Sequence, residues 1–172
     1  MHRRPNATVF MKGSTKPGAH TEGLRLLARG ELSVEGVRAR LQDRGYPPDE
    51  IASAIERLLE SGALDDGRVA RAFARTAATV KHRGRLRVMR ELLQMGIGSD
   101  VASEALGEVY GELDERALID DALRRKLRGR TRLNDQQETA RIYQFLMRQG
   151  FSPAGVAAAL RRYRSGRPID QD

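Results

Sequence analysis

The sequence predicts an all-α fold in which three tandem three-helix modules form an elongated array that can curve. Three observations lead to this prediction. Apolar residues recur at helical spacing along most of the 172-residue chain, a helix–glycine–apolar–helix corner occurs three times, and aromatic residues are few, with four Phe, four Tyr and no Trp. A helical fold built from Leu, Val, Ile and Ala suits this composition better than a β-sandwich.

The repeated corner becomes visible when Gly45, Gly96 and Gly150 are aligned. The first two glycines are 51 residues apart and the second two are 54 residues apart. Equal offsets from each glycine carry apolar residues, and this argues against three unrelated helical hairpins. The residues eight positions before the glycines are Val37, Val88 and Ile142, and those four positions before are Leu41, Leu92 and Leu146. The residues one position after the glycines are Tyr46, Ile97 and Phe151, and those ten positions after are Ile55, Leu106 and Leu160.

The predicted division of the chain is a flexible arm at 1–20, modules at 21–62, 63–111 and 112–164, and a flexible tail at 165–172. In the first module, Thr21 is expected to cap the first helix and Ser33 the second. Pro47 and Pro48 open the third helix, because proline is tolerated in a first turn. The expected core-facing residues are Leu24, Leu27 and Ala28; Val34, Val37 and Leu41; and Ile51, Ile55, Leu58 and Leu59.

The second module begins at Asp65 and Asp66, whose carboxylates can accept hydrogen bonds from the free N–H groups of a helix start. Gly84 separates the first helix from the next, and Gly96 ends that second helix. The expected core-facing residues are Val69, Ala72, Phe73, Thr76, Ala77 and Val80, followed by Leu86, Val88, Met89, Leu92 and Leu93.

The third module is expected to start near Asp114 and to contain a basic connector from Arg128 to Asn134. Asn134 or Asp135 caps the helix after the connector. Ser152 provides the last cap, and Pro153 fits the first turn that follows it.

The net charge of +8 and a pI near 10.5 favour a polyanionic partner, meaning nucleic acid or a nucleoprotein. Genomic base composition also enriches Arg and stays open as the cause. The absence of Cys excludes disulfides and thiolate metal sites and fits a cytoplasmic location. No apolar run approaches a membrane span.

No enzyme and no cofactor are predicted. Asp65 and Asp66 are explained by capping, and Asp120 and Asp121 are expected to be solvated surface. The chain has no GxxxxGKS/T phosphate loop, and His2, His20 and His82 are scattered.

The functional prediction depends on clustered basic residues, which neutralise phosphates in a salt-sensitive, sequence-independent way. The first cluster contains no acidic residue between Gly67 and Arg90. Its members are Arg68, Arg71, Arg75, Lys81, Arg83, Arg85, Arg87 and Arg90. The second contains Arg124, Arg125, Lys126, Arg128, Arg130 and Arg132, and a third contains Arg161, Arg162, Arg164 and Arg167.

Base stacking requires exposed aromatic rings. Tyr46, Phe73, Phe145 and Phe151 fall at expected core positions, and Tyr110, Tyr143 and Tyr163 are the candidates for surface rings. Backbone contact is therefore favoured over base readout.

The second module resembles the RecX family of bacterial recombination regulators. The matching residues are Leu64, Asp65, Asp66, Arg68, Ala70, Phe73 and Arg75, then Gly84, Arg87, Val88, Glu91, Leu92, Gly96 and Ile97. The similarity extends over roughly residues 24–163. Val69 stands where a bulky aromatic is usual, and Met95 replaces a usual basic residue.

The resemblance implies a regulator of the RecA recombinase, and the absence of a coiled-coil dimerisation segment from the sequence favours a monomer. Such a protein binds the RecA–single-stranded DNA filament, contacts single-stranded DNA directly or within it, and mostly inhibits strand exchange and ATP hydrolysis. Two alternatives stay open. One is a helix-turn-helix-like DNA-binding regulator, which would discriminate an operator sequence. The other is a helical scaffold that binds a peptide.

Overall fold

The computed structural model describes residues 16–130, 132–133 and 135–165. These residues form nine helices and no strand. The helices are α1 (Ala19–Leu27), α2 (Val34–Asp43), α3 (Pro48–Glu60), α4 (Asp66–Thr79), α5 (Arg85–Gln94), α6 (Ser99–Gly111), α7 (Glu115–Lys126), α8 (Gln136–Gln149) and α9 (Pro153–Ser165). None of them is long and apolar enough to cross a membrane, as far as the described residues go.

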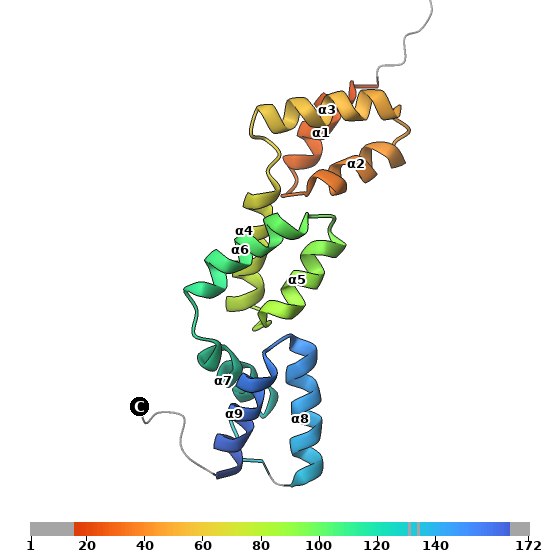
Figure 1. The fold of residues 1–172 in the computed structure, drawn as a ribbon. Helices are drawn as coiled ribbons and strands as arrows, with labels where there is room; N and C mark the ends of the chain where they lie inside the picture. Colours follow the sequence, from red (N-terminus) through yellow and green to blue (C-terminus); the bar gives the residue numbers. More distant parts are fainter. Residues whose placement is uncertain (1–15, 131, 134, 166–172) are drawn as a thin grey trace, which may run out of the picture.

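The helices group in threes, and each group buries its own hydrophobic core. Figure 1 shows the groups following one another along an elongated body, with α1–α3 at one end and α7–α9 at the other. The predicted all-α array of three-helix modules is confirmed. Tyr110 and Leu113 pack against both the second and the third core, so these two modules share apolar contacts.

The glycine corners have the same geometry in all three modules. Gly45, Gly96 and Gly150 have φ values of +72°, +78° and +90°, a left-handed conformation that glycine adopts without strain. The residue after each glycine donates its N–H to a carbonyl five positions earlier, at 3.2, 3.1 and 3.4 Å. All twelve aligned apolar residues are buried, as the repeat predicted.

Most predicted helix starts are confirmed by capping hydrogen bonds. The side chains of Ser33, Asp65, Asp114 and Asp135 each accept a hydrogen bond from a backbone N–H in the first turn that follows. The prediction for Thr21 is wrong, because α1 begins two residues earlier, after Gly18.

The predicted N-terminal arm falls into two parts. Its residues 1–15 lie outside the described residues, as do 166–172 of the predicted tail. Residues 16–20 pack on the first module. Lys16 Nζ donates to the Arg44 carbonyl at 2.7 Å, and Tyr46 donates its hydroxyl to the Pro17 carbonyl at 2.6 Å.

The predicted buried face of α4 is wrong in part. Ala72, Thr76 and Val80 are exposed, and Phe73 is only partly buried. The helix instead buries small residues: Val69, Ala70, Ala74, Ala77 and Ala78. Since α4 packs on α6, which buries Ala102 and Ala105, small side chains on both helices allow a close approach that larger ones would prevent.

Other apolar residues that were expected in the core are exposed. Leu24, Leu59, Leu86 and Leu93 have exposed fractions between 43% and 53%. Helical spacing selects one stripe of a helix, and these leucines lie at the edge of the stripe rather than at its centre.

The middle helices α2, α5 and α8 meet end to end. At the start of α5, Gly84 donates its N–H to Gln149 O at 2.8 Å and Leu86 donates to Gly150 O at 3.1 Å, so these groups satisfy carbonyls at the C-terminus of α8. At the start of α2, Ser33 Oγ donates to Met95 O at 2.6 Å. We call α2, α5 and α8 the middle-helix column; it lies along one side of the body in Figure 1.

The third module departs from the other two in its middle helix. Helix α8 has 14 residues, whereas α2 and α5 have 10 each. The additional N-terminal turn, preceded by a longer connector, accounts for the longer spacing to Gly150. In the first two modules the first and middle helices pack together, whereas α7 and α8 each pack mainly on α9.

Candidate nucleic-acid interface

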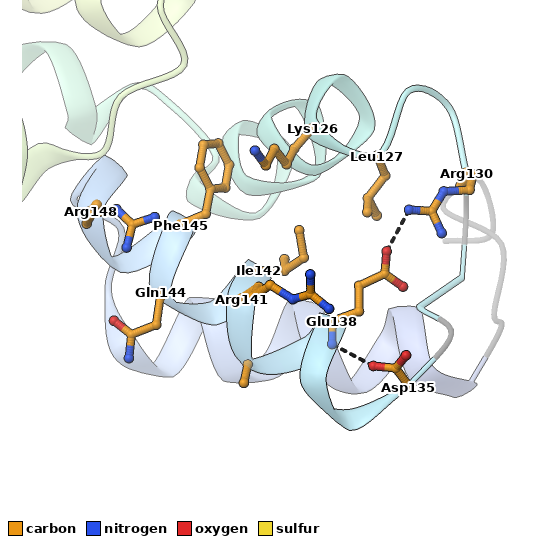
Figure 2. A pocket seen from close by; sticks show the side chains of 11 residues that line it. Lys126, Leu127, Arg130, Asp135, Glu138, Arg141, Ile142, Gln144, Phe145 and Arg148 are labelled. Atoms are coloured by element: carbon orange, nitrogen blue, oxygen red, sulfur yellow. Dashed lines mark hydrogen bonds and ion pairs between the residues drawn. The ribbon is translucent and has the colours of Figure 1, made fainter.

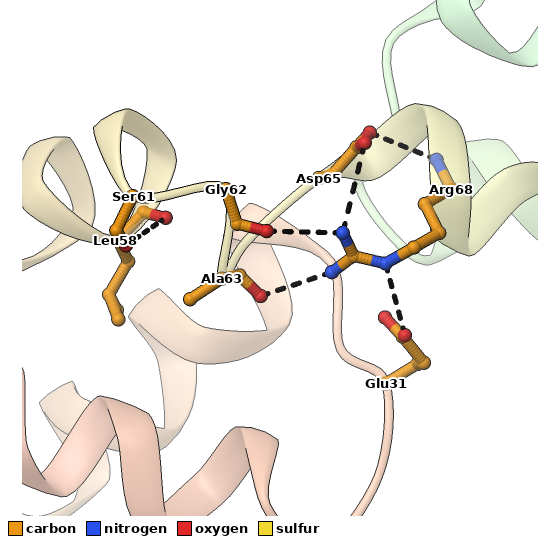
Figure 3. A network of polar contacts seen from close by, with 7 residues as sticks. All are labelled: Glu31, Leu58, Ser61, Gly62, Ala63, Asp65 and Arg68. Atoms are coloured by element: carbon orange, nitrogen blue, oxygen red, sulfur yellow. Dashed lines mark hydrogen bonds and ion pairs between the residues drawn. The ribbon is translucent and has the colours of Figure 1, made fainter.

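Arg68, the first member of the first basic cluster, is a structural residue. Its Nε lies 3.1 Å from Glu31 Oε1, and its two Nη atoms each donate to a carbonyl, of Gly62 and Ala63, at 3.1 Å (Figure 3). Asp65 Oδ2 lies 3.9 Å from Arg68 Nη1. The hydrogen bond from the backbone N–H of Arg68 to Asp65 Oδ1, at 2.9 Å, lowers the pKa of the Asp65 carboxyl. Arg68 therefore fastens the second module to the first.

Three more members of the first cluster are paired with carboxylates. Arg83 and Arg87 share Glu91, at 2.8 and 2.9 Å, and Arg87 Nη1 also donates to Gln149 Oε1 at 3.2 Å. Arg71 Nε lies 3.8 Å from Glu108 Oε2. The acid-free run in the sequence is thus partly neutralised in space.

The other four members of this cluster have exposed side chains and form no ion pair within the described part of the chain. Arg75 and Lys81 belong to the α4 side, and Lys81 Nζ lies 5.7 Å from the Phe73 ring centroid. Arg85 and Arg90 belong to α5, and Arg90 Nε donates to the Leu86 carbonyl at 3.3 Å. These four residues remain available to phosphates.

All six basic members of the second cluster are exposed. Two members are paired: Arg124 with Asp121 at 2.7 Å and Arg130 with Glu138 at 2.6 Å. Lys126 Nζ lies 5.1 Å from the Phe145 ring centroid. Arg125, Arg128 and Arg132 form no ion pair with any described residue.

Two further basic residues on α8 were not predicted as part of the interface. Arg141 and Arg148 are exposed, and each lines a hollow beside α8. They were missed because they stand alone in the sequence instead of in a run. Their spacing of seven residues, which places them on one face of a helix, was the available signal.

The two hollows form one basic surface, which we call the α5–α8 trough. One hollow, of about 820 Å³, lies between α7 and α8, and Figure 2 shows Arg141, Arg148 and Lys126 around the Phe145 and Ile142 side chains. The other, of about 500 Å³, lies between α5 and α8. Arg148 lines both hollows, and the second also contains Arg87, Arg90, Glu91, Gln94 and Met147.

The third cluster is only partly available for binding. Arg161 and Arg164 are exposed, and Arg167 lies outside the described residues. Arg162 donates to both carboxylate oxygens of Asp120, at 3.0 and 3.1 Å. The expectation that Asp120 is solvated surface is wrong, because only 5% of the residue is exposed and this ion pair joins α7 to α9.

The aromatic side chains also differ from expectation. Tyr163 is buried, and the hydroxyl of partly buried Tyr110 donates to Arg83 O at 2.7 Å; burial raises the pKa of both phenols. Phe145, which was expected in the core, is only partly buried. The trough therefore combines unpaired arginines with an aromatic ring, which suits a polyanion. Within the described part of the chain no His, Asp and Glu cluster could hold a metal ion.

Comparison with known proteins agrees with this architecture. Models of the first, second and third three-helix domains of RecX match residues 19–58, 65–106 and 114–160. A regulatory protein RecX from Pelodictyon phaeoclathratiforme is 30% identical over 88% of this chain and 92% of its own length. Another, from Halorhodospira halophila, is 34% identical over 86% and 89%.

Solved structures show the same fold. The crystal structure of RecX from Lactobacillus salivarius superposes with a TM-score of 0.68 at 17% identity, covering 83% of this chain and 92% of that one. A second crystal structure of a regulatory protein RecX gives a TM-score of 0.66 at 22% identity over 83% and 70%. Sequence and fold together place this chain in the RecX family of regulatory proteins.

Proposed function

We propose that this protein binds the RecA–single-stranded DNA filament as a monomer in the cytoplasm and inhibits strand exchange and ATP hydrolysis. The mechanism is steric: the elongated body occupies the filament groove or its end. Membership of a family of regulatory proteins supports a regulatory role. The observation that carries the proposal is the α5–α8 trough, which extends across a module boundary of an elongated body.

The trough suits a long polyanion because its cations come from two modules. Arg90 on α5 and Arg141 and Arg148 on α8 are exposed and lack carboxylate partners among the described residues. Contacts of arginine with phosphates release counterions and give affinity that falls with salt. Such contacts need neither a cofactor nor a base sequence.

The helix-turn-helix alternative receives less support. In such a unit the second helix of the pair enters the major groove, which here would be α3, α6 or α9. The exposed residues of these helices include several carboxylates, which phosphates repel: Asp49, Glu50, Glu56 and Glu60 on α3 and Asp100, Glu104 and Glu108 on α6. The charge distribution thus favours the trough over the glycine corners of the first two modules. Helix α9 carries exposed Arg161 and Arg164 and no carboxylate, so the third corner is the one at which the charges suit this alternative.

The test is ATP hydrolysis by the host's RecA on single-stranded DNA, titrated with this protein at fixed salt. We expect hydrolysis to fall. Loss at substoichiometric protein indicates action at filament ends, and loss near one copy per few RecA protomers indicates groove occupancy. Undiminished hydrolysis at saturating protein contradicts the proposal.

Charge reversal assigns the effect to the trough. The double variant Arg90→Glu, Arg148→Glu should inhibit at least tenfold less strongly, since each lost phosphate contact weakens binding. The control is Arg29→Glu, Arg57→Glu, which changes the net charge equally at exposed positions of the first module. Equal losses in both double variants would show that net charge, and not the trough, determines binding.

A further inference from the structure

Phe145 lies in the α5–α8 trough at a position where the repeat does not require an aromatic residue. It stands five residues before Gly150, and the equivalent residues in the other modules are Arg40 and Glu91. These polar residues show that the module core forms without a ring at this position. Phe145 is partly buried and lines the larger hollow.

The hollow around Phe145 is lined in part by a turn that the middle helices of the other two modules lack. The additional turn of α8 supplies Glu138, which lines the hollow. Leu127 and Ile142 form an apolar floor, with exposed fractions of 3% and 4%. A volume of about 820 Å³ lies within the range of small-molecule sites, roughly 300–1,000 Å³.

Cations surround this apolar floor. In Figure 2, Lys126 reaches from α7 toward Phe145, and Arg148 lies beside the ring on α8. Arg141 lies on the same helix, seven residues before Arg148. The acidic groups Asp135 and Glu138 are already engaged, one with a backbone N–H of α8 and the other with Arg130.

We propose that this hollow binds an unstacked base of single-stranded nucleic acid, with the base against Phe145 and the adjoining phosphates on Arg141 and Arg148. This inference rests on the proposed function and adds direct contact with a base. Aromatic rings hold bases of any sequence because every base has a π face. Lys126 is exposed on a flexible stem, so an entering base displaces its ammonium group toward a phosphate.

This geometry favours a single strand over a duplex and over an acidic peptide. Paired and stacked bases of a duplex cannot enter the hollow without being unstacked, which costs free energy. An acidic peptide would satisfy the arginines, but the apolar floor and the Phe145 ring between the cations suit a base better than a carboxylate.

The absence of Trp from the chain allows a direct test. Phe145→Trp introduces a single indole whose fluorescence is quenched when a base stacks on it. The matched control is Phe73→Trp, because Phe73 is also partly buried beside a lysine but lies on α4, outside the trough. The probes are oligo-thymidylate, an abasic oligonucleotide of equal length and the corresponding duplex.

We expect oligo-thymidylate to quench Phe145→Trp and to leave Phe73→Trp unchanged, and we expect little quenching by the abasic strand or the duplex. Phe145→Leu, which keeps an apolar side chain, should weaken oligo-thymidylate binding roughly tenfold and abasic binding much less. Thermal melting of each variant establishes that it is folded.

Equal quenching by the abasic strand would overturn the inference, since phosphates alone would then explain binding. The inference would also be overturned if Phe145→Leu bound oligo-thymidylate as tightly as the unmodified protein does. Failure of the unmodified protein to bind oligo-thymidylate would overturn it as well. The proposed function is tested separately, by whether the unmodified protein inhibits ATP hydrolysis by RecA. Binding of an acidic peptide at the same site, without quenching by oligo-thymidylate, would point to a protein ligand instead.

Discussion

At the scale of single residues, His82 occupies a conformation that its side chain does not favour. It lies between α4 and α5 with a φ of +48°, and only 8% of it is exposed. Neither ring nitrogen has a hydrogen-bond partner among the residues that the structure describes. Burial lowers the pKa of the imidazole, and Arg125 on α7 lowers it further, whereas Asp121 on the same helix raises it.

This environment makes the stability of the protein depend on pH. The folded state disfavours protonated His82, whereas the unfolded state binds the proton near the ordinary pKa of about 6.5. Stability is therefore unaffected well above pH 6.5 and is lost as the pH falls through that value. Urea unfolding of the unmodified protein should show this loss between about pH 7.5 and 5.5.

The variant His82→Asn should reduce this loss, because asparagine does not titrate and tolerates a positive φ. His20→Asn, on α1, is the matched control. A pH dependence that His82→Asn leaves unchanged, or that both variants reduce equally, would show that other groups are responsible.

The sequence predicted which side chains are exposed cations better than it predicted which of them pair with distant residues. The sequence identified exposed cations such as Arg90 and Lys126, because charge runs are visible without a structure. It did not reveal that Arg68 and Arg87 are structural. Their partners Glu31 and Gln149 stand 37 and 62 residues away, and such pairs form only when modules pack together.

At the scale of elements, the repeat was predictable and the helix faces were less so. Left-handed glycines and apolar residues at fixed offsets depend on local geometry, so the corners at Gly45, Gly96 and Gly150 could be read directly. The buried face of α4 depends on how closely α6 approaches, which spacing alone does not specify. Large apolar residues such as Val80 were therefore placed in the core wrongly.

The contact between α8 and α5 requires glycine on both sides. A Cβ on Gly84 would lie 2.3 Å from the backbone C and O of Gly150, and one on Gly150 would lie 2.3 Å from Arg87 N. Backbone atoms cannot rotate away as the end of a side chain can. The column therefore has a close junction between the second and third modules.

Gly84→Ala should therefore destabilise the protein by about 1–3 kcal/mol through overpacking. Gly98→Ala is the control, because Gly98 also precedes a helix in an extended conformation but has no atom within 4 Å of the added Cβ. Both substitutions replace a glycine at a helix N-cap, so the difference between their free energies of unfolding in urea isolates the cost of the close contact. Equal free energies of unfolding for the two variants would mean that α5 and α8 move apart to accept the added methyl group without loss of stability.

At the scale of the whole molecule, the proposed function depends on how the modules are held in a row. Arg90 and Arg148 come from different modules and line the same hollow because α5 and α8 meet end to end. Separate cores keep the modules distinct, and the junctions fix their positions. A compact packing of the same helices would shorten the surface offered to a filament.

The elongated shape is the feature on which the proposed groove binding most depends, and small-angle X-ray scattering measures it directly. A compact chain of 172 residues has a radius of gyration of about 16 Å. We expect a clearly larger value, because each module packs chiefly within itself and the three follow one another in a line (Figure 1). Light scattering at the same concentrations should give a mass near 19.2 kDa, so that a dimer cannot account for the larger radius. A radius near 16 Å from a monomer would mean that the modules fold back on one another in solution, and the trough would then be too short to follow a filament groove.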